Sequence, residues 1–395
     1  MRLVGVGLRG LVLGLVYGFD FVWRRRWILK FPIIQRPLFY SFKRGLPLSV
    51  RQALKLSTVA FIFSTVLATF LPDQCKRKST VWQFVVQLFY LYIGTSAISF
   101  CWELSHHLLQ VVHTRRFSFA PAQGSAAAET NPTEMLLEAL EQSNPRSLMQ
   151  YLAYLDLCMV SESNVEPWRR AAFFEETGET YRRIVSVCLR PLEQLTSKLG
   201  EGLEGTSGDK SESLAQQLNS PTDTHLDLKL HEALDDFQVC TWSSRTLAAL
   251  TARSHQEDRY GVAQLTGCNT EVVSTLLSTV IAVEACLGKK TSPQPAQLIG
   301  PASIRWATTS AGRRDGLSIA LPKKRGGVIY DKAFAMADVL RTSIYQIISA
   351  FEVDMQANAK AFVLDKNWVK DGKPLYGTRD ILVQKLMLFL GFNAN

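Results

Sequence analysis

Four side chains near position 105 form the group in this sequence that most resembles a set of metal ligands: Glu103, His106, His107 and His113. Glu103 and His107 are four residues apart and would share one face of a helix. A membrane di-iron enzyme needs several histidine boxes, and the remaining histidines have no matching spacing. We therefore interpret the cluster as the polar end of a helix at a membrane surface and predict no metal. A histidine-containing membrane enzyme is the alternative.

The segment Gly5-Val6-Gly7-Leu8-Arg9-Gly10 has the G-x-G-x-x-G spacing of a dinucleotide-binding loop. Such a loop follows a strand, opens a helix and needs an acidic residue about 20 positions later. Only a few residues precede Gly5, and no acid lies near position 30. The match is typical of a glycine-rich membrane helix, and we predict no cofactor.

A group of charged residues between 169 and 183 could resemble an acid–base site, because Glu175, Glu176 and Glu179 stand beside Arg169, Arg170, Arg182 and Arg183. At helical spacing, such residues are more typical of a solvated face of ion pairs. The sequence has no G-x-S-x-G elbow, no phosphate-binding loop of the Walker type and no H-E-x-x-H pair. We predict no catalytic residue and no enzymatic activity.

Apolar runs dominate the N-terminal part, where we predict membrane helices at about 3–22, 54–71 and 81–104. About 20 residues suffice for a helix to cross the hydrocarbon core. In the first run, Gly10, Gly14 and Gly18 recur every four residues and would form a packing face for another membrane helix. A cleaved signal peptide is the alternative for this run, but Arg and Trp follow it instead of small residues.

Basic and aromatic residues follow the first run, and Pro32, Pro37 and Pro47 predict that residues 27–48 form an irregular loop on the membrane surface. The interfacial residues that we expect there are Arg24, Arg25, Arg26, Trp27, Lys43 and Arg44. This loop carries more Lys and Arg than the connection after the second span. By the positive-inside rule, it and the C-terminal part lie in the cytoplasm.

The net charge of +9 is unevenly distributed along the 395 residues. Residues 1–116 contain 16 Lys/Arg and three acids, whereas the remainder is slightly acidic. The basic excess therefore accompanies the apolar runs, which favours a lipid bilayer as partner and no direct contact with nucleic acid. The seven cysteines are widely spaced and form no C-x-x-C pair, so we expect reduced, buried thiols.

The fold class that we predict is all-α: a membrane domain over 1–116, followed by a helical cytosolic domain over 146–395 with disordered inserts. Pro, Gly and Ala mark a linker at 117–145 with one short helical stretch, and mobile inserts are expected near 200–224 and 289–327. Residues 272–287 are apolar enough for a fourth span. They are short and flanked by Glu271 and Glu284, which favours a buried helix of the cytosolic domain.

Four segments of the chain closely resemble plant members of the Ndc-type transmembrane nucleoporin family: RRRWILKFPIIQRPLFYSFK (24–43), CWELSHHL (101–108), PRSLMQYLAYLDLCMV (145–160) and WRRAAFF (168–174). The likeness extends more weakly to the C-terminal helices. Family members have about six spans and then a cytosolic helical domain. With three predicted spans, this chain resembles the second membrane half plus that domain, as expected for an N-terminally shortened form.

The resemblance implies a structural membrane nucleoporin that anchors the nuclear pore complex to the nuclear envelope and supports pore assembly, and thereby nucleocytoplasmic transport. The implied partners are inner-ring nucleoporins that carry amphipathic helices and other pore-membrane nucleoporins. A transporter subunit is a further alternative, but it would need ionisable residues deep in several spans. The second predicted span has none after Lys55, and the third has only Glu103 near its end.

Overall fold

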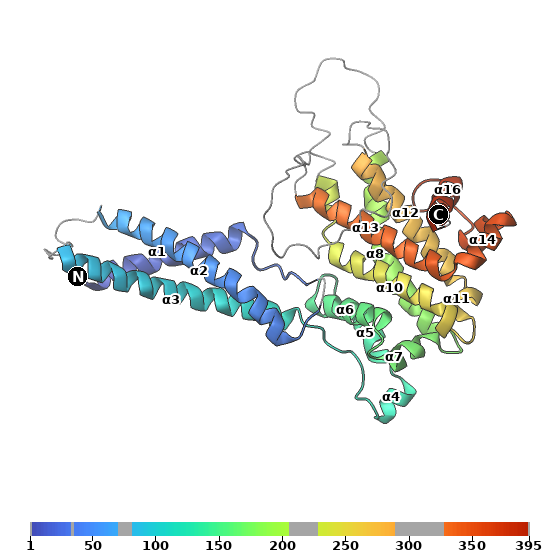
Figure 1. Ribbon diagram of the computed structural model, residues 1–395, viewed down its shortest axis with the longest axis horizontal. Helices are drawn as coiled ribbons and strands as arrows, with labels where there is room; N and C mark the ends of the chain where they lie inside the picture. Colours follow the sequence, from blue (N-terminus) through green and yellow to red (C-terminus); the bar gives the residue numbers. More distant parts are fainter. Residues whose placement is uncertain (1, 33–34, 70–80, 205–227, 289–327, 394–395) are drawn as a thin grey trace, which may run out of the picture. The chain divides into compact units, whose positions relative to one another are not determined.

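The computed structural model describes residues 2–32, 35–69, 81–204, 228–288 and 328–393. The chain forms two units, an N-terminal unit of residues 1–116 and a C-terminal unit of residues 117–395. Every regular element in the described ranges is helical, as predicted for the fold class (Figure 1).

Three long helices build the N-terminal unit: α1 (Arg2–Trp23), α2 (Leu38–Thr69) and α3 (Val81–His113). α2 packs against both α1 and α3. Small side chains allow this close approach, because Ala53 and Ala60 of α2 are almost completely buried. Two hydroxyl groups at the α2–α3 contact are paired inside the unit, since Ser96 donates to Ser57 Oγ at 3.1 Å and Ser57 donates to the Leu54 carbonyl. An apolar environment requires such pairing.

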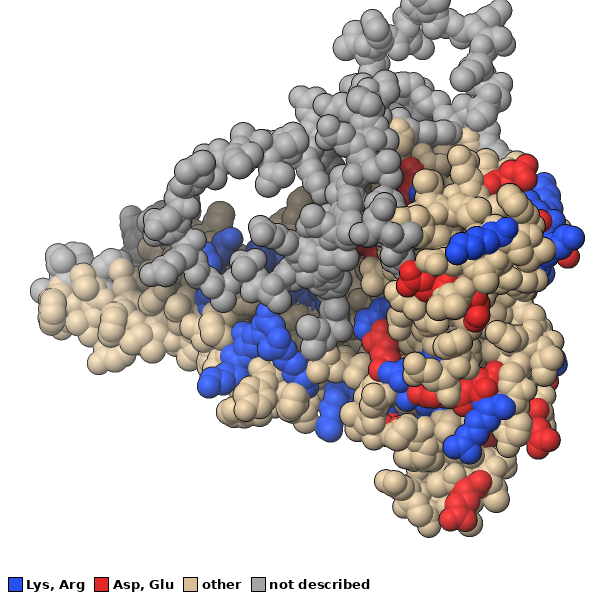
Figure 2. Space-filling view, turned by 45° about the vertical axis from the view of Figure 1, so that its right-hand side comes forward, with Lys and Arg blue, Asp and Glu red and all other residues tan. Residues whose placement is uncertain are grey.

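Large apolar side chains on the outer faces of these helices have no cover within the unit. The apolar windows of α1 and α3, Val6–Trp23 and Val85–His113, are only 11% and 6% buried, and Leu38–Leu67 of α2 is 28% buried. Figure 2 shows the same feature, because the N-terminal unit, at the left, is uncharged over most of its visible described surface. All three helices are long and apolar enough to cross a membrane.

A fourth helix meets the same criteria of length and composition but differs in burial. The window of α12 (Cys268–Gly288) is 72% buried inside the protein. Val272, Leu276 and Val280 are fully buried at helical spacing. The prediction that this run is a core helix of the second domain is therefore confirmed.

The helices of the N-terminal unit are longer than the predicted spans. α2 begins at Leu38 and continues through Pro47, where we expected an irregular loop, and α3 continues beyond 104 to His113. Proline removes one backbone donor and disfavours a helix interior. Here the tertiary contact between Gly45 and His107 supports the first half of α2 and outweighs that penalty. The predicted end of the second span, at 71, lies outside the described residues.

The C-terminal unit is a helical bundle. α10 packs against α6, α8 and α13, and α12 packs against α8 and α13 (Figure 1). Inter-helix contacts include a buried hydrogen bond of 2.8 Å between the hydroxyls of Thr196 and Thr279. The bounds of its helices other than α12 are α4 Ala126–Thr130, α5 Glu134–Gln142, α6 Leu148–Glu162, α7 Pro167–Ala171, the 3-10 helix η2 Ala172–Phe174, α8 Glu179–Glu204, α10 Phe237–Glu257, α11 Val262–Leu265, α13 Val328–Ala350, α14 Glu352–Lys360, α15 Leu364–Trp368 and α16 Arg379–Asn393.

Two of the predicted irregular segments contain more helix than expected. The segment 117–145 holds both α4 and α5, and α5 buries Leu136, Leu137 and Leu140. These leucines lie on one face at i, i+1 and i+4, so a short apolar pattern was enough to dock the segment on its neighbours α6 and α8. α8 continues to Glu204, beyond the predicted start of the first insert at 200. The rest of that insert and the insert at 289–327 lie outside the described residues.

Free thiols occupy the core of the C-terminal unit, as the sequence predicted. Cys158, Cys188, Cys240 and Cys286 are buried and unbridged. Burial raises the pKa of the Cys158 and Cys240 thiols to about 12, because the thiolate is poorly solvated there. These thiols are therefore protected from reagents while the unit is folded, and their labelling reports its unfolding.

Candidate functional site

A layer of polar and charged side chains connects α1, α2 and α3 at the level of the C-terminal end of α1. We call Asp20, Arg24, Arg26, Gln52 and Glu103 the charged layer. Arg26 donates from both terminal nitrogens to the two carboxylate oxygens of Glu103, each at 2.6 Å. Asp20 of α1 pairs with Arg24 at 2.8 Å and accepts a hydrogen bond from Gln52 of α2 at 3.3 Å. One residue from each helix thus takes part.

The end of α1 places Arg26 in this layer. Arg25 has a φ of 47°, the left-handed conformation that ends many helices. The backbone N–H of Arg26 then donates to the Phe21 carbonyl, and that of Arg25 donates to the Val22 carbonyl. This pair of bonds satisfies helix-end carbonyls and turns the chain toward α3. Arg26 consequently reaches Glu103, 77 positions away in the sequence.

The ion pair of Arg26 and Glu103 is shielded from solvent. The Glu103 side chain is 3% exposed and that of Arg26 is 13% exposed. Arg26 also lies 3.6 Å from Asp20. Taking such charges out of water is costly unless each is paired with good geometry. The layer meets this condition, because a bidentate Arg–carboxylate pair is among the strongest side-chain contacts.

An open groove of about 530 Å³ lies between α1 and α3 beside the charged layer. Its apolar part is formed by Gly14, Gly18, Trp102 and Leu109, and Arg26 lies at its polar part. A Cβ added at Gly10, Gly14 or Gly18 would meet no atom within 4 Å, so no described residue packs closely on this stripe. The predicted packing face is open within the chain, and its use by another helix remains a prediction.

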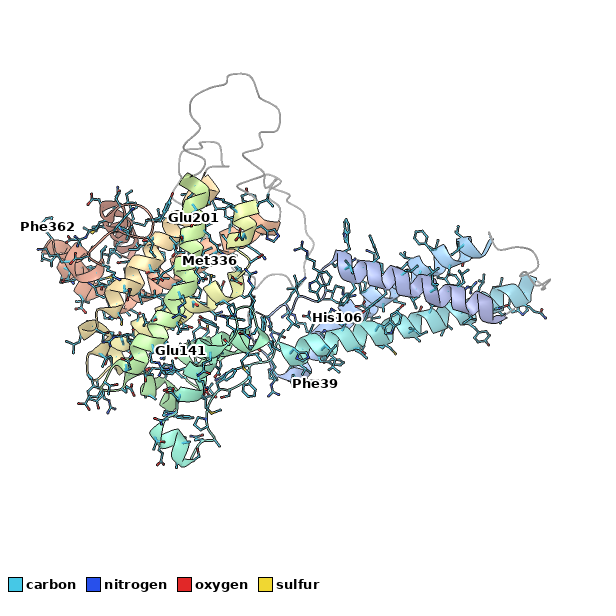
Figure 3. The ribbon with its side chains drawn as sticks, turned by 180° about the vertical axis from the view of Figure 1, so that it is seen from behind. Phe39, His106, Glu141, Glu201, Met336 and Phe362 are labelled. Atoms are coloured by element: carbon cyan, nitrogen blue, oxygen red, sulfur yellow. The ribbon has the colours of Figure 1, made fainter. Side chains whose placement is uncertain are left out.

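Two histidines of the predicted metal-like cluster, His106 and His107, pack against aromatic rings, whereas His113 is exposed. His107 stacks on the Phe42 ring at 5.6 Å and makes a 3.1 Å hydrogen bond with the Phe42 carbonyl. His106 meets the Phe21 ring edge-on at 6.0 Å, and Figure 3 shows it at the same end of the unit as Phe39. Glu103 is engaged by Arg26. Within the described ranges, no three His, Cys, Asp or Glu side chains gather as metal ligands.

Replacing Gly45 with alanine is expected to destabilise the N-terminal unit by about 1–3 kcal/mol. The new Cβ would overlap the imidazole ring of His107, which the Phe42 contacts hold in place. Thermal unfolding of the detergent-solubilised chain measures the effect. Gly94→Ala in α3 is the matched control, since its Cβ meets nothing within 4 Å. Equal unfolding temperatures for the two variants would contradict the proposed packing role of Gly45.

The other predicted interfacial residues are distributed around the charged layer. Arg25 and Trp27 are exposed beside it, and Lys43 and Arg44 are exposed on the first half of α2. Sequence reasoning missed the roles of Gln52 and Glu103. The pair of Asp20 and Arg24 could be predicted from the sequence, because the two residues are four positions apart on a helix. The pairing of Arg26 with Glu103 had a weaker signal: Glu103 is the one acid of the apolar helix α3, in an N-terminal part rich in arginine.

The glycine motif and the charged group at 169–183 also have definite places. Gly5, Gly7 and Gly10 lie inside α1, so the spacing does not form a phosphate-binding loop. The prediction of a solvated ion-pair face is wrong for Arg169 and Arg170, whose side chains are 2% and 3% exposed. Both fall in the short helix α7, which turns them into the core of the C-terminal unit.

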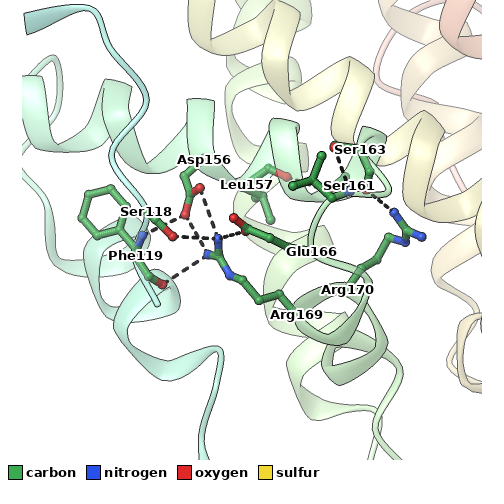
Figure 4. A network of polar contacts seen from close by, with 10 residues as sticks. Ser118, Phe119, Asp156, Leu157, Ser161, Ser163, Glu166, Arg169 and Arg170 are labelled. Carbon is green, nitrogen blue, oxygen red and sulfur yellow. Dashed lines mark hydrogen bonds and ion pairs between the residues drawn. The ribbon is translucent and has the colours of Figure 1, made fainter. Parts of the chain in front are cut away.

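Arg169 forms the centre of a buried network (Figure 4). It donates to Asp156 at 2.7 Å and to Glu166 at 2.8 Å, and it also bonds Ser118 Oγ and the Phe119 carbonyl. Asp156 in turn accepts from the Phe119 N–H at 2.9 Å. This network attaches the start of the C-terminal unit to α6 and α7.

Arg170, the next residue of α7, connects that helix to α10. It donates two hydrogen bonds of 2.7 Å to Glu257, which also pairs with Arg253 at 3.2 Å. Burial alone would raise the pKa of the Glu257 carboxyl, but the bonds and charges of Arg170 and Arg253 outweigh it and hold this pKa below 4.5. The pair therefore stabilises the folded unit above the ordinary glutamate pKa and loses this contribution as pH falls through the folded-state pKa.

Replacing Glu257 with glutamine should lower the unfolding temperature at pH 7 by roughly 2–4 °C, the effect of about 1 kcal/mol in a unit of this size. The difference from the unchanged chain should shrink as pH falls below the ordinary glutamate pKa toward the lower folded-state pKa, because protonation of Glu257 then removes the same charge that the substitution removes. Thermal unfolding across pH 3.5–7 measures this difference in unfolding temperature. The control is Glu179→Gln, which removes an exposed ion pair. A difference that is constant over this pH range would exclude the assigned role.

Comparison with known proteins supplies the family. The comparison with curated protein sequences finds no match. A family model described as nucleoporin protein Ndc1-Nup matches residues 6–228 and 210–357. The matched residues include the three apolar helices, the charged layer and most of the C-terminal bundle. On this match across most of its length, the chain belongs to the Ndc1-Nup family of nucleoporins.

Proposed function

We propose that this chain is a non-enzymatic anchor of the nuclear pore complex: α1, α2 and α3 cross the pore membrane, and the C-terminal unit holds other nucleoporins at it. The observation that carries the proposal is the exposed apolar surface of the three helices, whose hydrophobic windows are 6–28% buried. In water such a continuous surface would promote aggregation, whereas lipid solvates it. Membership of a nucleoporin family supports the membrane of the nuclear pore as the one that these helices cross.

The charged layer supports a definite depth in the bilayer. Up to Asp20, α1 offers 19 residues, or about 28 Å of helix. Up to Glu103, α3 offers 23 residues, or about 34 Å. Both lengths match a hydrocarbon core of about 30 Å. We infer that the charged layer lies at one membrane–water boundary and that the first half of α2 extends beyond it.

The basic residues favour an orientation for the unit. Arg25, Lys30, Arg36, Lys43 and Arg44 all lie between the ends of α1 and the middle of α2, on the side of the charged layer. Cationic loops are retained in the cytoplasm. We therefore propose that this side, and with it the C-terminal unit, faces the cytoplasm and the pore.

The partners that we propose are inner-ring nucleoporins with amphipathic helices and other pore-membrane nucleoporins. The C-terminal unit offers exposed apolar side chains for such contacts, including Phe362, which is 90% exposed, and Val353 and Leu265 (Figure 3). Phe362 also adopts a positive φ of 58°, which is unfavourable for a bulky residue. A hydrophobic side chain held outward at such a cost suits recognition by a partner.

The proposal is tested by imaging the tagged full chain in intact cells, followed by carbonate extraction of the membranes. We expect punctate staining at the nuclear rim and a chain that stays in the carbonate pellet. Release into the supernatant would exclude the membrane helices. Diffuse staining of the endoplasmic reticulum with a chain that resists carbonate would exclude the pore while leaving the helices in place. A histidine-containing enzyme would instead bring stoichiometric metal with the purified protein.

Replacing Gly14 with leucine should block a helix that packs in the groove between α1 and α3. The substitution has room within the chain, because its Cβ meets no atom within 4 Å, so folding of the unit should be unaffected. If the stripe is an interface, cross-linking of the chain to itself or to other pore-membrane nucleoporins should fall several-fold. Gly94→Leu on α3 is the control at an equally open position. Unchanged cross-linking would show that the stripe faces lipid.

A further inference from the structure

A row of cations follows one outer face of α2. Arg44, Arg51 and Lys55, which we call the α2 basic stripe, are seven and four residues apart and so fall within one narrow sector of the helix. All three are exposed. The stripe extends over about 16 Å along the helix axis. Arg51 and Lys55 flank Gln52 of the charged layer, so the stripe begins at that layer and continues along the first half of α2.

The charge of the stripe is not neutralised within the described part of the chain. Neither arginine nor the lysine forms an ion pair or side-chain hydrogen bond with any described residue. The acids described in the N-terminal unit are Asp20 and Glu103, and both are engaged by Arg24 and Arg26. Uncompensated cations close to one another repel, and an external anion relieves that repulsion.

Apolar side chains surround the stripe. Leu54, the neighbour of Lys55 in the sequence, is 46% exposed. Leu48 and Tyr40, in the first half of α2, are 69% and 62% exposed. A surface that changes from apolar to cationic at the level of the charged layer has the chemistry of the boundary between acyl chains and headgroups. Lys55 can extend its ammonium from the apolar side toward that boundary.

We propose that the α2 basic stripe binds the headgroup of an anionic glycerophospholipid, an inference that rests on the membrane orientation proposed above. Arg51 and Lys55, one helical turn apart, hold the phosphate at the level of the charged layer. Arg44 lies beyond them and pairs with the second anionic group of a headgroup such as that of phosphatidylserine. The acyl chains lie along the exposed apolar face of α2 that includes Leu54. An acidic protein segment suits the site less well, because two of the three cations adjoin the lipid-facing surface.

The test uses the full chain purified in a neutral detergent and titrated with phosphatidylserine or phosphatidylcholine, with bound lipid counted by native mass spectrometry. The unchanged chain should prefer phosphatidylserine. The triple variant Arg44→Gln, Arg51→Gln, Lys55→Gln should lose that preference by tenfold or more, because each cation at an anionic surface contributes a factor of about five. The preference of the unchanged chain should also weaken with added salt.

Two further variants separate the site from general charge and from folding. Lys360→Gln, Lys366→Gln, Lys373→Gln removes the same charge from exposed positions of the C-terminal unit and should leave the preference unchanged. A second triple variant keeps the charge of the stripe and should retain most of the preference for phosphatidylserine: Arg44→Lys, Arg51→Lys, Lys55→Arg. Thermal unfolding should be the same for all variants, since the replaced side chains are exposed.

Several outcomes would overturn the inference. A triple glutamine variant that keeps the full preference for phosphatidylserine would exclude the stripe as the site. Displacement of phosphatidylserine by equal concentrations of inorganic phosphate would show that the site takes a free anion and not a lipid. If the chain remains in the membrane during carbonate extraction but shows no lipid preference, only this inference fails. Release by carbonate would remove the proposed anchor as well.

Discussion

Replacing Arg169 with methionine should lower the free energy of unfolding of the C-terminal unit by about 3–5 kcal/mol. The change leaves the fully buried Asp156 carboxylate without the Arg169 cation, and Glu166 loses the ion pair with Arg169. Burial disfavours the charged guanidinium, but the bonds and charges of Asp156 and Glu166 outweigh it and raise the pKa of Arg169 above its ordinary value. Arg169 is therefore held as a cation in the folded unit, and its removal leaves the buried carboxyl of Asp156 without the two bonds that Arg169 donates.

The buried thiols provide the measurement for this variant. Pulse labelling of Cys158, Cys188 and Cys240 with a maleimide over a denaturant series reports opening of the C-terminal unit in the full chain. We expect the midpoint for Arg169→Met to move to clearly lower denaturant. Arg182→Met, which removes an ion pair exposed on both sides, is the control and should change stability by less than about 1 kcal/mol. Coincident labelling curves for the two variants would disprove the assigned role.

Removing the carboxylate of Glu103 should be comparably damaging to the N-terminal unit, with an expected loss of about 3–5 kcal/mol for Glu103→Ala. Arg26 would then stay near the apolar helices with only Asp20 at 3.6 Å. The expected structural consequence is separation of the segment after α1 from α3, because the two bonds of 2.6 Å provide that connection. Thermal unfolding in detergent measures the loss, with Lys43→Met, an exposed cation of α2, as control.

A double replacement separates this ion pair from general disruption of the helix. Arg26→Met combined with Glu103→Leu removes both charges and leaves neither side chain unpaired, so its stability should recover most of the loss of Glu103→Ala. If the double variant is less stable than both single variants, the pair is not the cause. In cells, Glu103→Ala should also be depleted from the nuclear rim if the charged layer sets the depth of the helices.

The networks around Arg26 and Arg169 share one arrangement of charges. In each, an arginine that follows a helix end or lies in a short helix binds a carboxylate of another helix, Glu103 of α3 for Arg26 and Asp156 of α6 for Arg169. In each, the arginine is bound by both of its terminal nitrogens. A bidentate pair of arginine and carboxylate requires a defined relative orientation of the two side chains. It therefore fixes the position of one helix or segment relative to another, which non-directional apolar contacts do less well.

Much of the architecture was predictable from local pattern. The ends of α1 were predicted to within a few residues, because a long apolar run with few charges, closely followed by three arginines, is typical of a membrane helix and its end. The burial of Cys158, Cys188 and Cys240 followed from helical periodicity in the same way. The first half of α2 was missed, because the prolines of that segment argue locally for a loop. A contact between Phe42 and His107 of α3, 65 positions apart in the sequence, overrides them.

The sequence by itself determined the division of this chain into an apolar, basic part and a mixed-charge helical part, since that division depends only on the order of residue types and on their solvation. It also determined the helical fold class and, through its resemblance, the family. Only the tertiary structure decided which charges are buried: Arg169 and Arg182 look alike in the sequence, yet one is enclosed and the other exposed. Burial depends on neighbours brought together by folding, and no local pattern contains that information.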